Sequence, residues 1–314
     1  MYSELPSCLH SFDVISRGAT GWVFQIDDEI ALKYTRKDRL DEFQNENAIY
    51  DLLEEHRAPP TLLQSFLRLP GINFMPLMAG TLDQRINDNQ RRDYQKARCL
   101  EVLKLEPTQK IEQWAMELSG AISWLASIGL AHGDLRPANI LLDFRDHLKL
   151  ADFDCASDIG SDHQGSAPPW SRMLGPEAGL KRGTYGVYGA ESEQFTFGVI
   201  LYTITRGIVL YEEDPPGAVL LLQEKIFPPL SDGHLDRVID RCWKGQYGSL
   251  AELAEEMASL EGAKATQATL LDDEHVNKMH WRCTHLLATK LSAVLVESVN
   301  TEKVDKSKLV GNRD

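Results

Sequence analysis

The stretch from residue 132 to residue 154 constrains this chain more than any other feature of its sequence. It reads HGDLRPAN, continues through two short apolar runs split by a polar turn, and ends in ADFD. The two apolar runs, within residues 139–151, predict a β-hairpin. Such a hairpin separates two polar groups, with Asp134 and Asn139 before it and Asp152 after it. Polar side chains placed on both sides of a hairpin in this way indicate a functional site.

The side chains of this stretch are suited to moving a phosphoryl group. Asp134 can accept a proton from an attacking hydroxyl, and Arg136 can neutralise charge on the moving group. Asn139 and Asp152 offer oxygen ligands, which a hard cation such as Mg²⁺ prefers. The alternative, that these are solvated loop side chains, is disfavoured because the strand context that such a motif requires is also present.

A second feature is a lysine inside an apolar strand. Lys33 lies in the run IALKY, and Glu46 lies on the apolar stripe of a helix predicted over residues 38–55. A buried carboxylate needs a partner, and Lys33 is the nearest upstream cation that lies inside an apolar run. A lysine held by a glutamate can place its ammonium on phosphate oxygens. From these residues alone, a lysine that extends to solvent and a glutamate that faces water are equally consistent.

A third feature is a glycine-bearing turn between two predicted strands, within residues 16–23. Gly18 and Gly21 let the backbone approach a phosphate chain without a Cβ clash. Taken alone, this pattern is more typical of an ordinary hairpin turn. Together with the lysine and the stretch from residue 132, it points to one reaction.

Composition and charge exclude several other classes of protein. A chain of 314 residues with 43% hydrophobic side chains can bury a sizeable core, and its net charge of −14 disfavours nucleic acid or anionic lipid as a partner. The five cysteines are scattered and form no CxxC pair, which is typical of a reducing compartment. The start resembles no secretory signal, and no apolar run reaches about 18 residues. We therefore expect a cytoplasmic or nuclear protein without a membrane partner.

Hydrophobic periodicity outlines the rest of the chain. It predicts helices over residues 111–128 and 193–206, and a helical pair over residues 234–261. The polar residues 83–98 indicate a surface connection or an exposed helix. Residues 156–190 are rich in Gly, Ser and Pro and are therefore expected to form a loop.

In this order, the motifs resemble the eukaryotic protein-kinase family over about residues 10–262. The resemblance implies a two-lobed α+β fold, with a small antiparallel-sheet N-lobe at about residues 10–77 and a mainly helical C-lobe at about residues 78–262. It also implies that ATP binds between the lobes with Mg²⁺, and that proteins are the phosphate acceptors. Residues 263–314 then form a C-terminal tail, with a helix expected over residues 286–299 and a disordered end.

The resemblance also assigns roles to individual residues. Lys33, held by Glu46, positions the α- and β-phosphates, Asp134 and Arg136 serve catalysis, and Asn139 and Asp152 hold Mg²⁺. Residues of the glycine-rich loop, the third strand and the hinge are implied to contact the nucleotide: Ser16, Gly18, Gly21, Val23, Ala31, Lys33, Met75, Pro76 and Met78. A proline has no N–H, so the hinge donor to adenine would come from Met78.

Several positions depart from the family pattern, and among them Ser16 replaces the first glycine of the glycine-rich loop. Gly133 replaces the arginine that anchors a phosphorylated activation loop in many relatives, so we expect a switch other than loop phosphorylation. Asp154 replaces the glycine of the DFG motif, and Glu193 stands where the family usually has aspartate. No arginine near Tyr247 is available to pair with Glu177 at the end of the activation segment.

These motifs predict ATP- and Mg²⁺-dependent phosphoryl transfer to protein hydroxyls. Ser/Thr acceptors are preferred because Arg136-Pro137 is closer to Ser/Thr-kinase loops than to tyrosine-kinase loops. The motifs HGDLRPANILL and LADFD are similar to those of kinase-like proteins common in filamentous fungi.

Two alternatives remain open at this point. A small-molecule kinase of the aminoglycoside or choline type also favours HGD, but the segment Gly175-Pro176-Glu177 resembles a peptide-docking platform and argues against it. A pseudokinase scaffold that binds ATP is favoured by Asp154 and Ser16, while the intact lysine, base and metal-ligand positions oppose it.

Overall fold

A computed structural model describes residues 5–264 and 268–294 of the chain. The chain divides into two compact units, one of residues up to Met78 together with those from Thr269 onward, and one of residues Ala79–Ala268. The first unit is built on an antiparallel sheet and the second is mainly helical. The predicted fold class is thereby confirmed.

The sheet of the first unit has five strands in the order β1-β2-β3-β5-β4, and all neighbours are antiparallel. The strands are β1 (Asp13–Arg17), β2 (Gly21–Gln25), β3 (Ile30–Thr35), β4 (Leu67–Leu69) and β5 (Ile72–Pro76). Helix α1 (Leu40–Glu55) follows β3 and buries Phe43, Glu46 and Tyr50. This is the stripe that the sequence predicts, so the strand-then-helix expectation for this region is confirmed.

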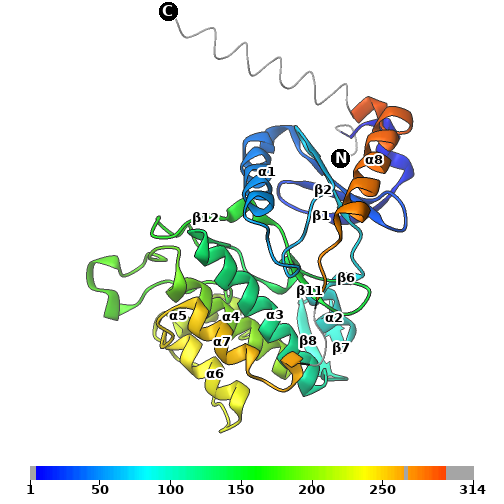
Figure 1. The fold of residues 1–314 in the computed structure, drawn as a ribbon. Coiled ribbons are helices and arrows are strands. Elements are labelled where there is room, and N and C mark those ends of the chain that lie inside the picture. Colours follow the sequence, from blue (N-terminus) through cyan, green and yellow to red (C-terminus); the bar gives the residue numbers. More distant parts are fainter. Residues whose placement is uncertain (1–4, 265–267, 295–314) are drawn as a thin grey trace, which may run out of the picture. The chain divides into compact units, whose positions relative to one another are not determined.

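The C-terminal helix α8 (Asp273–Thr289) belongs to the first unit, although about 200 residues separate it from the sheet (Figure 1). Its Met279, Cys283 and Leu287 are buried in one apolar cluster with Phe24, Leu32 and Phe74 of the sheet. The expectation of one helix over residues 286–299 was wrong, because the helix that contains residue 286 begins at Asp273 and ends at Thr289. Residues 295–299, and the end expected to be disordered, lie outside the described residues. The buried face uses sulfur-containing side chains between charged ones, which weakens the periodic signal.

The second unit packs long helices around a buried core. Trp114, Leu118 and Ile122 of α3 are almost completely buried, as are Phe197 and Val199 of α4. Its helices are α2 (Leu82–Asp88), α3 (Thr108–Ser127), α4 (Ala190–Arg206), α5 (Pro215–Gln223), α6 (His234–Trp243) and α7 (Leu250–Ala258). The helices expected near residues 111–128, 193–206 and 234–261 are therefore confirmed, while α5 was not predicted.

A small sheet in the second unit carries the predicted hairpin. Strands β10 (Ile140–Leu142) and β11 (Leu148–Leu150) are antiparallel, and β6 (Gly80–Thr81) pairs with β10. The hairpin expected within residues 139–151 is confirmed. It is the element that separates Asp134 and Asn139 from Asp152.

The polar stretch at residues 83–98 contains structure that the sequence did not reveal. Helix α2 fills its start, capped by reciprocal hydrogen bonds between Thr81 and Gln84. A hairpin of β7 (Gln90–Asp93) and β8 (Arg98–Val102) follows, so the expected connection or exposed helix was only partly right. Its strands pair charges rather than alternate apolar side chains, as in the 2.7 Å contact between Arg91 and Glu101. In the sequence, such a run of charged and polar residues cannot be told from a solvent-exposed loop.

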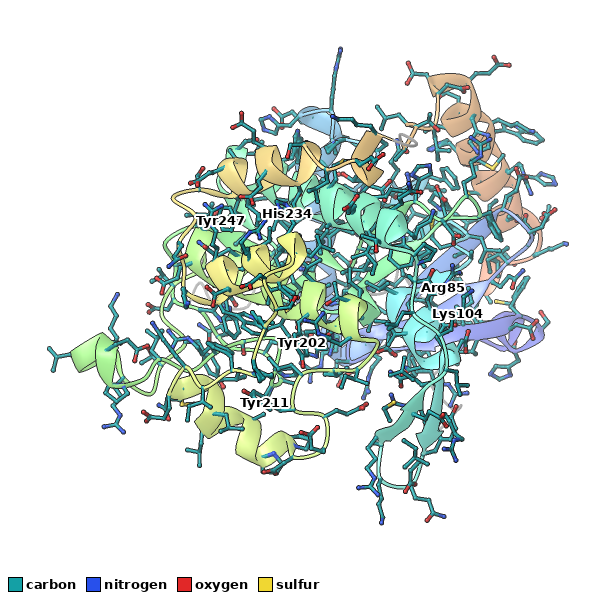
Figure 2. The ribbon with its side chains drawn as sticks, turned by 90° about the horizontal axis from the view of Figure 1, so that it is seen from below. Arg85, Lys104, Tyr202, Tyr211, His234 and Tyr247 are labelled. Carbon is teal, nitrogen blue, oxygen red and sulfur yellow. The ribbon has the colours of Figure 1, made fainter. Side chains whose placement is uncertain are left out.

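Ion pairs tie helix α2 to the segment before α3. Arg85 Nε lies 2.6 Å from Glu106 Oε1, and Figure 2 shows Arg85 beside the segment that carries Lys104. The remaining elements of the described chain are short: β9 (Leu130–Ala131), β12 (Ser157–Asp158) and 3-10 turns at Ser7–Ser11, Lys37–Arg39, Pro137–Asn139, Phe153–Cys155, Pro176–Lys181 and Gly262–Lys264. No helix in the described part has both the length and the hydropathy that crossing a bilayer requires.

Candidate active site

The carboxylate of Asp134 is held by three side chains in the second unit. Asn139 Nδ2 donates to Asp134 Oδ2 at 2.9 Å and also to the Asp134 backbone carbonyl at 2.8 Å. Ser166 Oγ donates to the other oxygen, Oδ1, at 2.6 Å. Arg136 Nε lies 3.1 Å from Oδ2. Both carboxylate oxygens therefore have fixed partners, and a hydroxyl group already lies at hydrogen-bond distance from one of them.

Arg136 contributes charge to this site more than a hydrogen bond. Its Nε is buried and has no hydrogen-bond partner among the described residues, so the contact with Asp134 is electrostatic. A buried donor without a partner is costly, and an anion with free oxygen lone pairs relieves that cost. Arg136 therefore places positive charge beside the Asp134 carboxylate, and its role toward a phosphoryl group stays a prediction.

His132 has a structural role beside the Asp134 site. The side chain is completely buried, and its Nε2 lies 3.0 Å from the carbonyl oxygen of Ala151. Burial lowers the pKa of His132, which favours a neutral ring that donates to this carbonyl. The bond ties the turn before Asp134 to the residue before Asp152, which positions the two aspartates relative to each other.

Glu193 holds the same turn from the other side. Its two carboxylate oxygens accept the backbone N–H groups of His132 and Gly133, each at 3.2 Å. Complete burial raises the pKa of Glu193 to about 7. Glu193, whose side chain is longer than the aspartate expected here, therefore uses both carboxylate oxygens to accept these backbone N–H groups.

Gly133 occupies a place that no larger residue can fill without a shift. Its backbone is left-handed, with a φ of +81°, and a Cβ would lie 2.5 Å from the carbonyl oxygen of Cys155. The segment at Cys155 thus leaves no room for a side chain at this position. The departure at Gly133 is built into the local backbone.

Asn139 and Asp152 have the donor chemistry that a magnesium ion requires. Both hydrogen bonds given above for the Asn139 amide use Nδ2, which leaves its oxygen as the atom suited to a cation. Asp152 has a left-handed backbone, with φ of 66° and ψ of 73°. The next residue, Phe153, packs edge-on against His132, with 5.6 Å between the ring centroids. Non-glycine residues in this region of φ/ψ are often found at functional sites.

In the first unit, Lys33 and Glu46 form the contact that the sequence predicts. Lys33 Nζ donates to Glu46 Oε2 at 2.7 Å, and the side chains are 9% and 1% exposed. Lys33 lies in β3, between Val23 of β2 and Asn73 of β5. The pair therefore links the centre of the sheet to α1.

The two glycines of the glycine-bearing turn differ in the space that surrounds them. The Gly18 N–H donates to the Gly21 carbonyl at 2.9 Å, which closes the turn after Ser16 and Arg17 of β1. A Cβ on Gly21 would lie 2.2 Å from the carbonyl oxygen of Tyr34, whereas a Cβ on Gly18 would meet nothing closer than 3.9 Å. Gly21 is thus required by the pairing of β2 with β3, and Gly18 is the position with open space.

The predicted hinge residues follow the central strands directly. Met75 pairs with Ala31 and Pro76 pairs with Ile30 across β5 and β3. The Leu77 N–H then donates to the Glu29 carbonyl at 2.8 Å. Pro76 and Met78 therefore flank a residue whose backbone is fixed to the turn before β3.

Glu177 has a partner that the sequence did not reveal. Arg172 Nη1 lies 2.7 Å from its Oε1, and Lys225 Nζ lies 3.7 Å from the same oxygen. Glu177 is thus paired with an arginine of its own segment, whereas Arg241, whose guanidinium lies 4.0 Å from the centre of the Tyr247 ring, pairs with Glu252 and Glu256. Arg172 and Ser166 both lie in the Gly-, Ser- and Pro-rich loop, which has no periodicity that could have singled them out.

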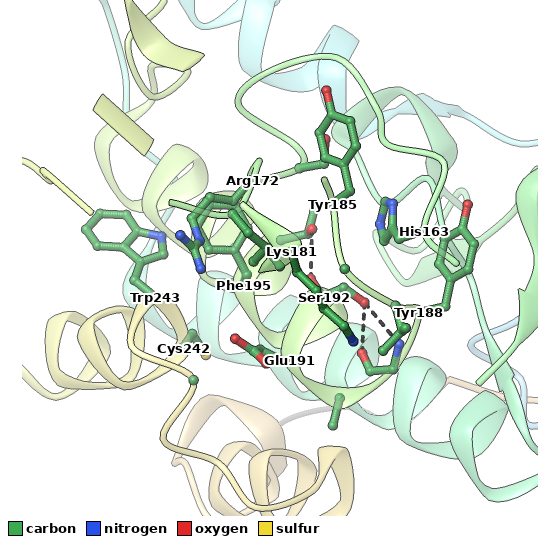
Figure 3. A pocket seen from close by; sticks show the side chains of 18 of the residues that line it. His163, Arg172, Lys181, Tyr185, Tyr188, Glu191, Ser192, Phe195, Cys242 and Trp243 are labelled. Atoms are coloured by element: carbon green, nitrogen blue, oxygen red, sulfur yellow. Dashed lines mark hydrogen bonds between the residues drawn. The ribbon is translucent and has the colours of Figure 1, made fainter. Parts of the chain in front are cut away.

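A cavity of about 390 Å³ lies beside this segment in the second unit. Arg172, Tyr185, Phe195 and Trp243 are among the residues that line it (Figure 3). Ser171 also lines it, and its Oγ accepts the N–H of Ser166 at 2.9 Å and donates to the Ser166 carbonyl at 2.6 Å. The cavity wall is therefore joined to the serine that contacts Asp134.

Comparison with known proteins identifies the region that contains these residues. The family described as "Protein kinase domain" matches residues 10–227, which is more than half of the chain. The match includes both the Lys33–Glu46 pair and the Asp134 site.

Individual relatives are distant. The chain is similar to the dual specificity protein kinase pyk3 of Dictyostelium discoideum, with 28% identity over 182 residues, covering 55% of this chain and 13% of the relative. It is 25% identical over 288 residues to the putative wall-associated receptor kinase-like 11 of Arabidopsis thaliana, covering 83% of this chain and 34% of the relative. CBL-interacting protein kinase 24 of rice is 33% identical over 106 residues, covering 32% of this chain and 22% of the relative. The chain thus spans about a third or less of these relatives' length.

Proposed function

This chain belongs to the protein kinase domain family, and on that premise we propose that it transfers the γ-phosphoryl group of ATP to hydroxyl groups of proteins. The single observation that supports this best is the Asp134 carboxylate. It accepts a hydroxyl, that of Ser166, at 2.6 Å, it is oriented by Asn139, and it lies beside the guanidinium of Arg136. A general base must have this reach to the proton it removes.

The proposed step is an in-line displacement at the γ-phosphorus. The oxygen of the acceptor hydroxyl forms a bond to phosphorus while the bond from phosphorus to the β–γ bridging oxygen breaks. The hydroxyl proton passes to Asp134, and ADP leaves with the electron pair of the broken bond. The charge of Arg136 offsets that of the transferred group, which lowers the barrier without any covalent intermediate on the protein.

Positioning of the nucleotide and its metal ion is assigned to the residues that carry the family motifs. Lys33, held by Glu46, would bind the α- and β-phosphate oxygens, and Asn139 and Asp152 would hold Mg²⁺ through oxygen. The ion would neutralise phosphate charge when bound. The residues of the glycine-bearing turn and the hinge would contact the rest of ATP.

For the acceptor, we propose serine and threonine. The residues Arg136-Pro137 after Asp134 support this preference, as does similarity to a protein of Clostridium perfringens whose name is probable serine/threonine-protein kinase CPE1738, at 29% identity over 119 residues. The HGD and DFD variants support placement of the chain with the kinase-like proteins of filamentous fungi.

The test is phosphate transfer from radiolabelled ATP to two kinds of acceptor. Wild-type protein with Mg²⁺ is given casein and poly(Glu-Tyr) in one arm, and kanamycin and choline in the other. Asp134→Asn should lower transfer to casein at least a hundredfold. The matched control is Glu255→Gln, which removes one carboxylate from an exposed position of α7 and should leave transfer unchanged.

Each alternative has its own result. Label in kanamycin or choline but not in protein would establish a small-molecule kinase. Label in poly(Glu-Tyr) alone would overturn the Ser/Thr preference. A thermal shift with ATP and Mg²⁺, but no transfer to any acceptor, would identify a pseudokinase. Equal transfer by Asp134→Asn and wild type would refute the assignment of Asp134.

A further inference from the structure

The turn that precedes β3 is attached to the predicted hinge. Asp27 Oδ1 accepts the backbone N–H groups of Glu29 at 2.9 Å and Ile30 at 2.8 Å, which shapes the turn. The carbonyl of Glu29 accepts the N–H of Leu77 at 2.8 Å. The position of the turn therefore fixes the backbone between Pro76 and Met78.

Arg282 of the C-terminal helix α8 forms ion pairs with two residues of this turn. Arg282 Nη2 donates to Asp27 Oδ2 at 2.6 Å, and Arg282 Nη1 contacts Glu29 Oε2. Asp27 thus has one carboxylate oxygen on the backbone of the turn and the other on the guanidinium. A planar guanidinium with several donors in fixed directions can hold two carboxylates in one geometry.

The helix that carries Arg282 is itself firmly placed. Met279 and Cys283, which flank Arg282 on α8, are completely buried in the apolar cluster of the first unit. Because this part of α8 is packed on the core, the Arg282 guanidinium has little freedom to move away from Asp27 and Glu29. The ion pairs themselves are about a quarter to two-fifths exposed, so their effect on global stability is small.

We propose that Arg282 is a positioning residue for the nucleotide site. Through Asp27 and Glu29 it holds the Leu77 backbone, and so it sets the direction of the Pro76 carbonyl and the Met78 N–H toward an adenine ring. The proposal rests on the proposed function for the role of Pro76 and Met78. It gives the C-terminal segment a part in ATP binding at a site some 200 residues away in the sequence.

The experiment compares Arg282→Ala with Lys278→Ala. Lys278 lies one turn earlier on the same helix and is exposed, so its substitution removes the same charge without touching the turn. Binding of adenosine and of ATP with Mg²⁺ is measured by calorimetry, together with KM and kcat for transfer to casein. We expect Arg282→Ala to raise the adenosine Kd and the KM for ATP about fivefold to tenfold, with kcat within twofold of wild type. Arg282→Lys should restore part of the loss, since a lysine reaches only one carboxylate.

The outcomes separate this proposal from the proposed function. If wild type binds neither adenosine nor ATP, the proposed function fails, and this role fails with it. If wild type binds both and Arg282→Ala matches it, only the role of Arg282 is refuted. The role is also refuted if kcat falls while KM is unchanged, or if loss of affinity tracks a drop of more than about 5 °C in Tm, because that pattern is purely structural. Faster amide exchange at Leu77 in Arg282→Ala, but not in Lys278→Ala, would support it.

Discussion

Lys33 Nζ lies 2.7 Å from Glu46 Oε2, and the two side chains are 9% and 1% exposed. Lys33→Met removes the ammonium that neutralises the buried carboxylate of Glu46. Removal of one partner of a buried ion pair costs about 3–5 kcal/mol. We expect Lys33→Met to lose roughly that much free energy of unfolding in urea, together with ATP binding.

The double variant Lys33→Met/Glu46→Leu separates folding from function. An apolar pair of similar volume is often neutral or stabilising relative to a buried ion pair, so most of the lost free energy of unfolding should return. ATP binding should not return, because the ammonium is still missing. A double variant that binds ATP like wild type would show that Lys33 has only a structural role.

The hydrogen bond from Ser166 to Asp134 should matter for turnover. Ser166→Ala removes a bond to a charged acceptor, which is worth about 1.5–3 kcal/mol and corresponds to a loss of about tenfold or more in kcat if the bond orients the base. Ser166→Thr keeps the hydroxyl and should keep most of the activity. The measurement is steady-state transfer to casein.

Ser161→Ala is the control for that experiment. Ser161 lies in the same segment, and its hydroxyl donates to the carbonyl of Asp158 rather than to the site. If Ser166→Ala behaves like Ser161→Ala, the bond has no role in turnover. A rise in kcat on Ser166→Ala would instead mean that Ser166 occupies the place of the acceptor hydroxyl.

Two glycines with nearly the same backbone provide a test of the closed space beside Asp134. Gly133 and Gly129 have φ values of +81° and +85°, but a Cβ carbon on Gly133 would lie 2.5 Å from the Cys155 carbonyl oxygen and 3.0 Å from the Tyr188 ring, whereas one on Gly129 would have no neighbour within 4 Å. Gly129→Ala should cost about 1–2 kcal/mol for the left-handed backbone alone. Gly133→Ala should cost at least 1 kcal/mol more because of the overlap. Equal costs in urea unfolding would contradict the geometry.

The sequence was most informative where a local pattern and a chemical need coincide. Glu46 lies on an apolar stripe, which indicates that its carboxylate needs a partner, and the family resemblance then implied Lys33, which the residues alone left equally open to solvent. The β10–β11 hairpin and α3 follow from apolar periodicity, which tertiary packing preserves.

Other features depend on contacts between distant segments, which local patterns do not record. Arg282 meets Asp27 and Glu29 only because α8 packs on the sheet. Ser166 is one of several serines in an irregular loop, and nothing but the folded segment brings it to Asp134. The reason for Gly21 was also hidden, because the Tyr34 carbonyl that excludes a side chain there belongs to a different strand.

Glu193 should make stability depend on pH in an unusual direction for a carboxyl group. Burial raises its pKa from 4.5 to about 7, so the folded protein favours the protonated form. Its contribution to stability is therefore fully present below about pH 4.5 and is lost as pH rises through about 7. Relative to Glu193→Gln, which cannot titrate, wild type should lose roughly 2 kcal/mol of unfolding free energy between pH 5 and pH 8. Urea unfolding of both proteins across this range measures the difference, and the exposed-site variant Glu255→Gln should run parallel to wild type. Parallel curves for Glu193→Gln and wild type would show that Glu193 keeps an ordinary pKa and that its two backbone N–H contacts fully offset its burial.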